Sequence, residues 1–100
     1  MSCIICDLAD GSAIQEKYYE DENIVIVQNI RSHNYKDKQL CIWKEHKEKL
    51  TPKELVTFIN TLLEIRDNLN KEEPWWEIVW SMRSQPQHFH LHLARLDETQ

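Results

Sequence analysis

The chain has 100 residues, with 12 lysines and arginines against 17 aspartates and glutamates, which gives a net charge of -5 at pH 7. A chain of this length buries about two-thirds of its unfolded surface, so we expect a single domain over residues 1–100. The acidity disfavours a protein that binds a nucleic-acid polymer by neutralising its phosphates, but a local site for a small phosphorylated ligand is compatible with it. Lysines crowd one part of the chain, which we interpret as a solvated surface. They are Lys36, Lys38, Lys44, Lys47, Lys49 and Lys53.

No stretch reaches the roughly 20 apolar residues that span a membrane, and the start "MSCIICDLADG" lacks the features of a signal peptide. We therefore expect a soluble, cytoplasmic protein without a membrane partner. Of the three cysteines, Cys3 and Cys6 form the C-x-x-C segment "CIIC". In a short intracellular chain this spacing indicates metal or redox chemistry more than a disulfide framework.

Three strands are predicted in the first half of the chain. The segments "KYYEDE" (17–22) and "NIVIVQNI" (23–30) are typical of a hairpin whose strands are joined by a polar turn. After a polar loop, "QLCIWKEH" (39–46) predicts a third strand, with Leu40 and Ile42 at alternate positions.

A helix is predicted to begin at "TPKEL". Thr51 is its N-cap, Pro52 takes the first helical position, and Glu54 completes a capping box. Apolar residues then recur at three- and four-residue spacing and give the helix one apolar face. This face consists of Leu55, Phe58, Ile59, Leu62, Leu63 and Leu69, and the helix is predicted to end around Asn68, Asn70 and Pro74.

Two more strands are predicted in "WWEIVWSM" (75–82) and "HFHLHLARL" (88–96). Short strands around one long helix indicate the α+β class, with an antiparallel sheet of about five strands and one main helix crossing one face.

The last of these strands places His88, His90 and His92 at alternate positions. In a strand the three imidazoles point to one face and line a shared surface, while the apolar residues between them enter the core. Imidazoles about 6.5 Å apart would repel one another if all were protonated. At least one should therefore be neutral near pH 7, as a nucleophile, a base or a metal ligand must be.

The run "HFHLHLA" (88–94) resembles the motif of the histidine triad family, in which three histidines alternate with apolar residues. The order of the other elements is also similar: an N-terminal C-x-x-C, a strand hairpin, a strand followed by a histidine, a central helix and two further strands. The resemblance implies the histidine triad fold. It also implies hydrolysis or transfer at the α-phosphate of a nucleotide, through a nucleotidyl-histidine intermediate.

Carried over by position, the resemblance makes His90 the nucleophile, since a neutral imidazole attacks phosphorus and then leaves readily. His92 would bind the phosphate oxygens and stabilise the charge of the transition state. The related uridylyltransferases carry glutamine at the third position, so His92 favours the hydrolases of phosphoramidates or dinucleoside polyphosphates.

The resemblance also implies a structural zinc. In relatives with an N-terminal C-x-x-C, both cysteines, a histidine before the helix and the first histidine of the motif hold the metal. The matching residues are Cys3, Cys6, His46 and His88, a set suited to tetrahedral zinc. His88 is therefore a candidate for both the metal site and the catalytic triad.

The segment before the triad, "SMRSQPQ" (81–87), lacks the glycines of the family's phosphate loop. Glycine lets a backbone approach a phosphate closely, and its loss restricts that approach. The remaining candidates for substrate binding are Arg83, Ser84 and Gln85, of which Arg83 could pair with a phosphate through two hydrogen bonds.

Three of the four tryptophans lie within residues 75–80. One of the four could stack on a nucleobase, but we interpret them as core or interface residues. Family members commonly pair through the helix and the strand before the triad, so the resemblance implies a homodimer that buries this segment.

Two alternatives remain open at this point. The three strand histidines could instead be ligands in a metal-binding protein. The chain could also be a degenerate triad domain that binds nucleotides without turnover, which is consistent with the glycine-free segment.

Overall fold

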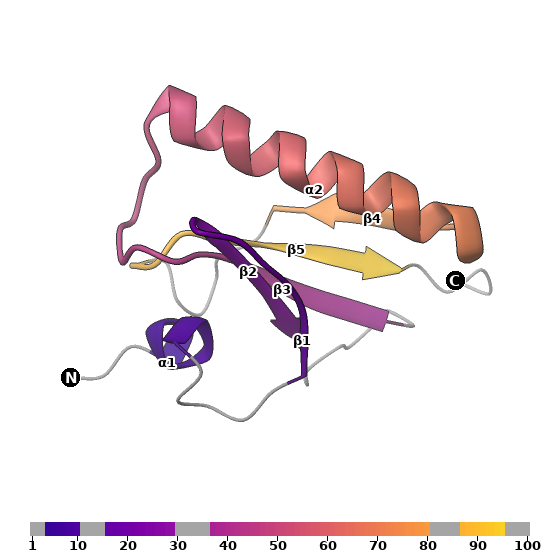
Figure 1. Ribbon diagram of the computed structural model, residues 1–100, viewed down its shortest axis with the longest axis horizontal. Helices are drawn as coiled ribbons and strands as arrows, with labels where there is room; N and C mark the ends of the chain where they lie inside the picture. The colour runs from indigo at the N-terminus through magenta and orange to yellow at the C-terminus, as the bar shows by residue number, and fades with distance from the viewer. Residues whose placement is uncertain (1–3, 11–15, 30–36, 81–86, 96–100) are drawn as a thin grey trace.

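The computed structural model describes residues 4–10, 16–29, 37–80 and 87–95, which form one antiparallel sheet with two helices packed on it (Figure 1). The strands lie side by side in the order β1-β2-β3-β5-β4. The elements are α1 (Ile4–Asp10), β1 (Lys17–Glu20), β2 (Ile24–Gln28), β3 (Asp37–Trp43), α2 (Pro52–Glu72), β4 (Trp76–Val79) and β5 (His90–Arg95). The predicted α+β class with a five-stranded antiparallel sheet is confirmed.

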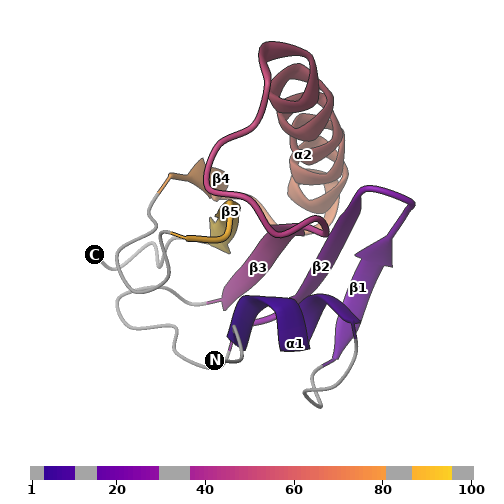
Figure 2. The same cartoon turned by 90° about the vertical axis from the view of Figure 1, so that its left-hand side faces the viewer.

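The two helices cover opposite faces of the sheet, as Figure 2 shows with α2 on one side and α1 on the other. The core on the α2 side consists of Ile24, Ile26, Cys41, Trp43, Phe58, Leu62, Trp76, Phe89, Leu91 and Leu93. A smaller cluster on the α1 side consists of Ile5, Val25, Val27, Leu40 and Ile42. Because both faces are covered, the run "IVIV" of β2 is buried at every position.

The short helix α1 is absent from the sequence-based expectations. It has only 7 residues, too few for helix propensity to stabilise it alone. It is held instead by Ile5, which is buried against the sheet, and by Leu8 and Ala9, which pack on the same cluster. Tertiary contacts of this kind leave little periodic signal in so short a segment.

The loop after β3 differs from the prediction. It explains why β3 ends at Trp43 rather than at His46, and why β5 begins at His90 rather than at His88. The backbone of Phe89 donates from its N–H to the carbonyl of Lys47 at 2.7 Å and accepts from the N–H of Trp43 at 3.3 Å. Phe89 is thus bonded on one side to the last residue of β3 and on the other to the loop that follows it. This exchange brings the loop that carries His46 against the start of β5.

The start of α2 follows the prediction closely. The Thr51 hydroxyl accepts from the Glu54 N–H at 3.2 Å, and the Glu54 carboxylate accepts from the Thr51 N–H at 2.9 Å. The same carboxylate accepts from Lys47 Nζ at 2.8 Å, which ties the preceding loop to the helix and lowers the pKa of Glu54. Neither helix in the described ranges is long and apolar enough to cross a membrane.

The tryptophans divide into two buried and two exposed residues. Trp43 and Trp76 are 5% and 6% exposed and belong to the core under α2. Trp75 and Trp80 flank the edge strand β4 and are 53% and 57% exposed. Trp75 has a φ of 82°, a left-handed conformation in which the chain turns from α2 into β4.

We expect Thr51→Ala to destabilise the protein by about 1 kcal/mol, because the substitution leaves the Glu54 N–H without its cap. Thr57→Ala is the matched control, since the Thr57 hydroxyl bonds only its own helix at the Lys53 carbonyl. Urea unfolding followed by circular dichroism measures both. Equal midpoints for the two variants would contradict the role of the cap.

Candidate functional site

The antiparallel pairing of β3 with β5 sets which way the histidine row points. His90 lies opposite Ile42 and His92 opposite Leu40, so both imidazoles share the α1-side face of the sheet. Leu91 belongs to the core on the other face, which confirms the predicted alternation. The imidazoles do not line an open surface, however, because His88, His90 and His92 are 0%, 5% and 8% exposed.

His90 is held in one tautomer by a backbone carbonyl. Its Nδ1 lies 2.8 Å from the carbonyl oxygen of His88, and because a carbonyl only accepts, Nδ1 carries the proton. Nε2 of the neutral ring therefore carries the lone pair. Burial lowers the pKa of His90 below its usual 6.5, against the opposing effect of the carbonyl. A neutral, oriented imidazole of this kind can act as a nucleophile.

His92 stands beside His90, with ring centroids 5.6 Å apart and planes at 86°. Burial, with the charges of Lys38 and His90, lowers the pKa of His92 to about 4. Its Nδ1 is buried and has no hydrogen-bond partner within the described part of the chain. A neutral ring with an unsatisfied nitrogen is suited to an added hydrogen-bonding group, because burying a polar atom unpaired is costly.

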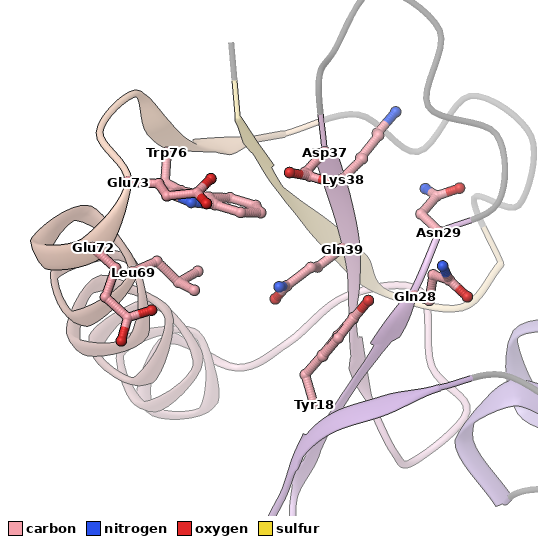
Figure 3. Close-up of a pocket in the computed structure, with 10 residues that line it drawn as sticks. All are labelled: Tyr18, Gln28, Asn29, Asp37, Lys38, Gln39, Leu69, Glu72, Glu73 and Trp76. Carbon is pink, nitrogen blue, oxygen red and sulfur yellow. The ribbon is translucent and has the colours of Figure 1, made fainter. Parts of the chain in front are cut away.

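Lys38 is not among the predicted site residues, because its stretch of lysines is typical of a solvated surface. It pairs with Ala94 across the β3–β5 ladder, two positions from the pair Leu40 and His92, and so shares their face of the sheet. Figure 3 shows its side chain directed to the opposite side of β3 from Gln39. Only the strand register could reveal that this cation lies beside a histidine of the triad motif.

A second group is formed by Cys6 of α1, His46 of the loop after β3 and His88. The Cys6 sulfur lies 3.0 Å from Nδ1 of His46 and 3.2 Å from Nδ1 of His88. One ligand atom from each residue falls within 4.8 Å of the others. Segments at residues 6, 46 and 88 thus converge on one point.

The chemistry of this group fits a metal ion. Nε2 of His88 lies 2.6 Å from the carbonyl of Trp43 and must donate to it, so Nδ1 is left with a lone pair toward Cys6. Burial lowers the pKa of His88, which keeps that lone pair available. A cation between the sulfur and the two nitrogens would bind all three atoms, and thiolate and imidazole are the ligands that zinc prefers.

The remaining predicted site residues, Cys3, Arg83, Ser84 and Gln85, lie outside the described residues. Among the described residues, His90 and His92 are not part of a potential metal-binding group. The three histidines of the motif therefore divide into two groups. His88 faces Cys6, whereas His90 and His92 lie on the α1-side face of the sheet. This arrangement does not favour the alternative in which all three bind one metal.

Comparison with known proteins identifies the fold. The sequence matches no family model and no curated protein. Among solved structures, a HIT family protein from Bacillus anthracis is 29% identical, with a TM-score of 0.77 over 97% of this chain and 75% of that one. A HIT family hydrolase from Legionella pneumophila is 24% identical, with a TM-score of 0.73 over 99% of this chain and 95% of that one. A HIT family hydrolase from Clostridium thermocellum is 18% identical, with a TM-score of 0.74 over 99% and 94%.

Acid should destabilise the protein through His92. Its pKa is about 4 when folded and 6.5 without perturbation, so between these values the unfolded chain binds a proton that the folded chain does not. The contribution is complete above pH 6.5 and is lost as the pH falls toward 4. A tenfold change in proton affinity corresponds to about 1.4 kcal/mol. After a discount for screening of His92 by solvent, we expect the free energy of unfolding to fall by roughly 2 kcal/mol over this pH range.

Urea unfolding of the parent protein and of His92→Gln, with a chelator present, measures this loss. The variant should lose less stability than the parent between about pH 7.5 and about pH 4.5, because glutamine does not titrate. Equal losses in the two proteins would show that burial does not suppress protonation of His92.

Proposed function

We propose that this chain, a histidine triad family protein by its fold and motif, is a hydrolase that acts at the α-phosphate of a nucleotide. The observation that carries the proposal is the bond from Nδ1 of His90 to the His88 carbonyl, because it leaves Nε2 free to attack. Two of the similar structures are named hydrolases, which supports the general class. The substrates that we propose are nucleoside phosphoramidates or dinucleoside polyphosphates.

In the proposed reaction, the lone pair on Nε2 of His90 forms a bond to the α-phosphorus while the bond from phosphorus to the leaving group breaks. Water then attacks the same phosphorus, and the P–N bond to His90 breaks and restores the imidazole. The His88 carbonyl stabilises the positive charge that develops on the His90 ring during attack. His92 would donate a hydrogen bond to a phosphate oxygen.

Lys38 provides a positive charge on the same face as these histidines. In the proposed complex it would attract the phosphates, in part compensating for the glycines that "SMRSQPQ" (81–87) lacks. The lack of glycine also supports a second candidate function, a domain that binds nucleotides without turning them over. The two functions share a binding site and differ only in chemistry at His90.

We also propose that Cys6, His46 and His88 hold a structural zinc, with Cys3 as the fourth ligand. Such an ion would cross-link α1 to the start of β5, and would add stability rather than act on the substrate. We further propose a cytoplasmic homodimer. In the part of the chain that the structure describes, the outer edge of β4 has no partner strand, and Trp75 and Trp80 are exposed beside it, which supports pairing between two copies.

Replacing the nucleophile gives the direct test of the reaction. His90→Ala should lower kcat/KM for an adenylyl phosphoramidate more than about 1000-fold, because the other oriented lone pair, on Nδ1 of His88, faces Cys6 and cannot replace Nε2 of His90. Thr57→Ala, far from the site on the exposed side of α2, is the control and should keep full activity.

Retained turnover in His90→Ala would contradict the assignment. If the parent protein is stabilised by nucleotides in a thermal-shift panel but turns over none of them, the binding-only function replaces the hydrolase.

Elemental analysis tests the metal. The parent protein and His90→Ala should each contain roughly one zinc per chain, whereas Cys6→Ser and His46→Gln should lose it and unfold at lower temperature. Zinc that persists in Cys6→Ser but is lost from His90→Ala would contradict the proposed ligand set and restore the strand histidines as ligands.

A further inference from the structure

A cavity of about 480 Å³ opens on the α2 side of the sheet, opposite the face of His90 and His92. Figure 3 shows it between the end of α2 with the start of β4 on one side, and β1 and β3 on the other. Its lining includes the apolar Leu69 and Trp76 and the aromatic ring of Tyr18. Its volume lies within the range of small-molecule sites, while most of its other lining residues are polar or charged.

The floor of this cavity contains the side chain of Gln39, whose amide has no hydrogen-bond partner among the described residues. Gln39 is 9% exposed, and Figure 3 shows its side chain directed toward Leu69 and Trp76, into the cavity. Within the described residues no hydrogen bond or ion pair involves the Gln39 side chain. The amide is not among the fully buried, unsatisfied atoms of the described residues, so it faces the open space of the cavity and can bond a ligand there.

The walls are held rigidly by bonds outside the cavity. Asn70 exchanges two hydrogen bonds with the backbone of Trp76, at 2.9 and 3.2 Å, which fixes the indole. Arg95 joins β5 to both sides of the mouth, with ion pairs to Glu73 at 2.8 Å and to Asp37 at 3.8 Å. These contacts join α2, β3, β4 and β5 around the cavity and would limit the ordering that binding requires.

The charge at the mouth decides which ligands fit. Asp37, Glu72 and Glu73 contribute three carboxylates, whereas Arg95 supplies one positive charge to two of them. Lys38 also lines the cavity, but its ammonium group points away from it in Figure 3. Counted over the described residues, the mouth is therefore net negative, which repels phosphates and attracts cations.

We propose that this cavity binds a small organic cation, an ammonium or guanidinium group on a short alkyl chain. The cationic group would lie between Glu72 and the other two carboxylates. The alkyl chain would pack on Leu69 and on the rings of Trp76 and Tyr18, which also favour a cation electrostatically. Gln39 would accept a hydrogen bond from the ligand. The site is separate from the proposed reaction, because it lies on the other face of the sheet.

Agmatine and spermidine are suitable probes, followed by NMR of the ¹⁵N-labelled full chain. Either probe should saturably shift the side-chain amide signals of Gln39 and the indole signal of Trp76, with a roughly millimolar dissociation constant. The imidazole signals of His90 and His92 should stay in place. Added salt should weaken binding, because part of the attraction is between exposed charges.

Two variants and one control make the test specific. Gln39→Leu and Glu72→Gln should each weaken binding about threefold or more, by removing a hydrogen bond and a charge. Glu22→Gln removes an exposed carboxylate in the turn between β1 and β2, at the other end of the sheet, and should leave binding unchanged. No saturable shift with either probe up to about 10 mM would overturn the proposal. So would equal binding by all three variants, or shifts of the same signals by inorganic phosphate instead.

Discussion

The antiparallel pairing of β3 with β5 holds the sheet together at its centre and determines what each face presents. It sets His90 against Ile42 and His92 against Leu40, while Leu91 and Leu93 enter the core beneath α2. A slip of one residue would turn both histidines into that core and the leucines out of it, at a large cost in burial. The apolar residues between the histidines therefore keep the imidazoles on their face.

His88 connects the two chemical groups of the molecule. Its ring donates to the Trp43 carbonyl and faces Cys6, whereas its own carbonyl accepts from His90. Movement of the group around Cys6 would therefore displace the carbonyl that orients His90. The loop after β3 is fixed at the same place, because Lys47 bonds both the Phe89 N–H and the cap of α2. A short series of hydrogen bonds thus connects the cap of α2, the group of Cys6, His46 and His88, and the histidines of the triad motif.

The two faces of the sheet differ in charge as well as in the helix that packs on them. Consecutive residues of β3 point to opposite faces, so Lys38 adds a positive charge beside the triad while Gln39 enters the cavity below α2. Carboxylates lie at the mouth of that cavity, where the partly buried Arg95 pairs with two of them. Among the described residues, the two faces therefore differ in the charge that they present beside their respective sites.

The sequence by itself determined the class of fold, the cap of α2 and the alternation of "HFHLHL", because these depend on neighbours within a few residues. The apolar run of β2 also indicated strands, although not that a second helix covers their far face. Only the tertiary structure brought Cys6, His46 and His88 together, set Lys38 beside His92 and left Gln39 unpaired in a cavity. These features depend on strand register and loop closure, which join residues far apart in the chain and leave no periodic pattern along it.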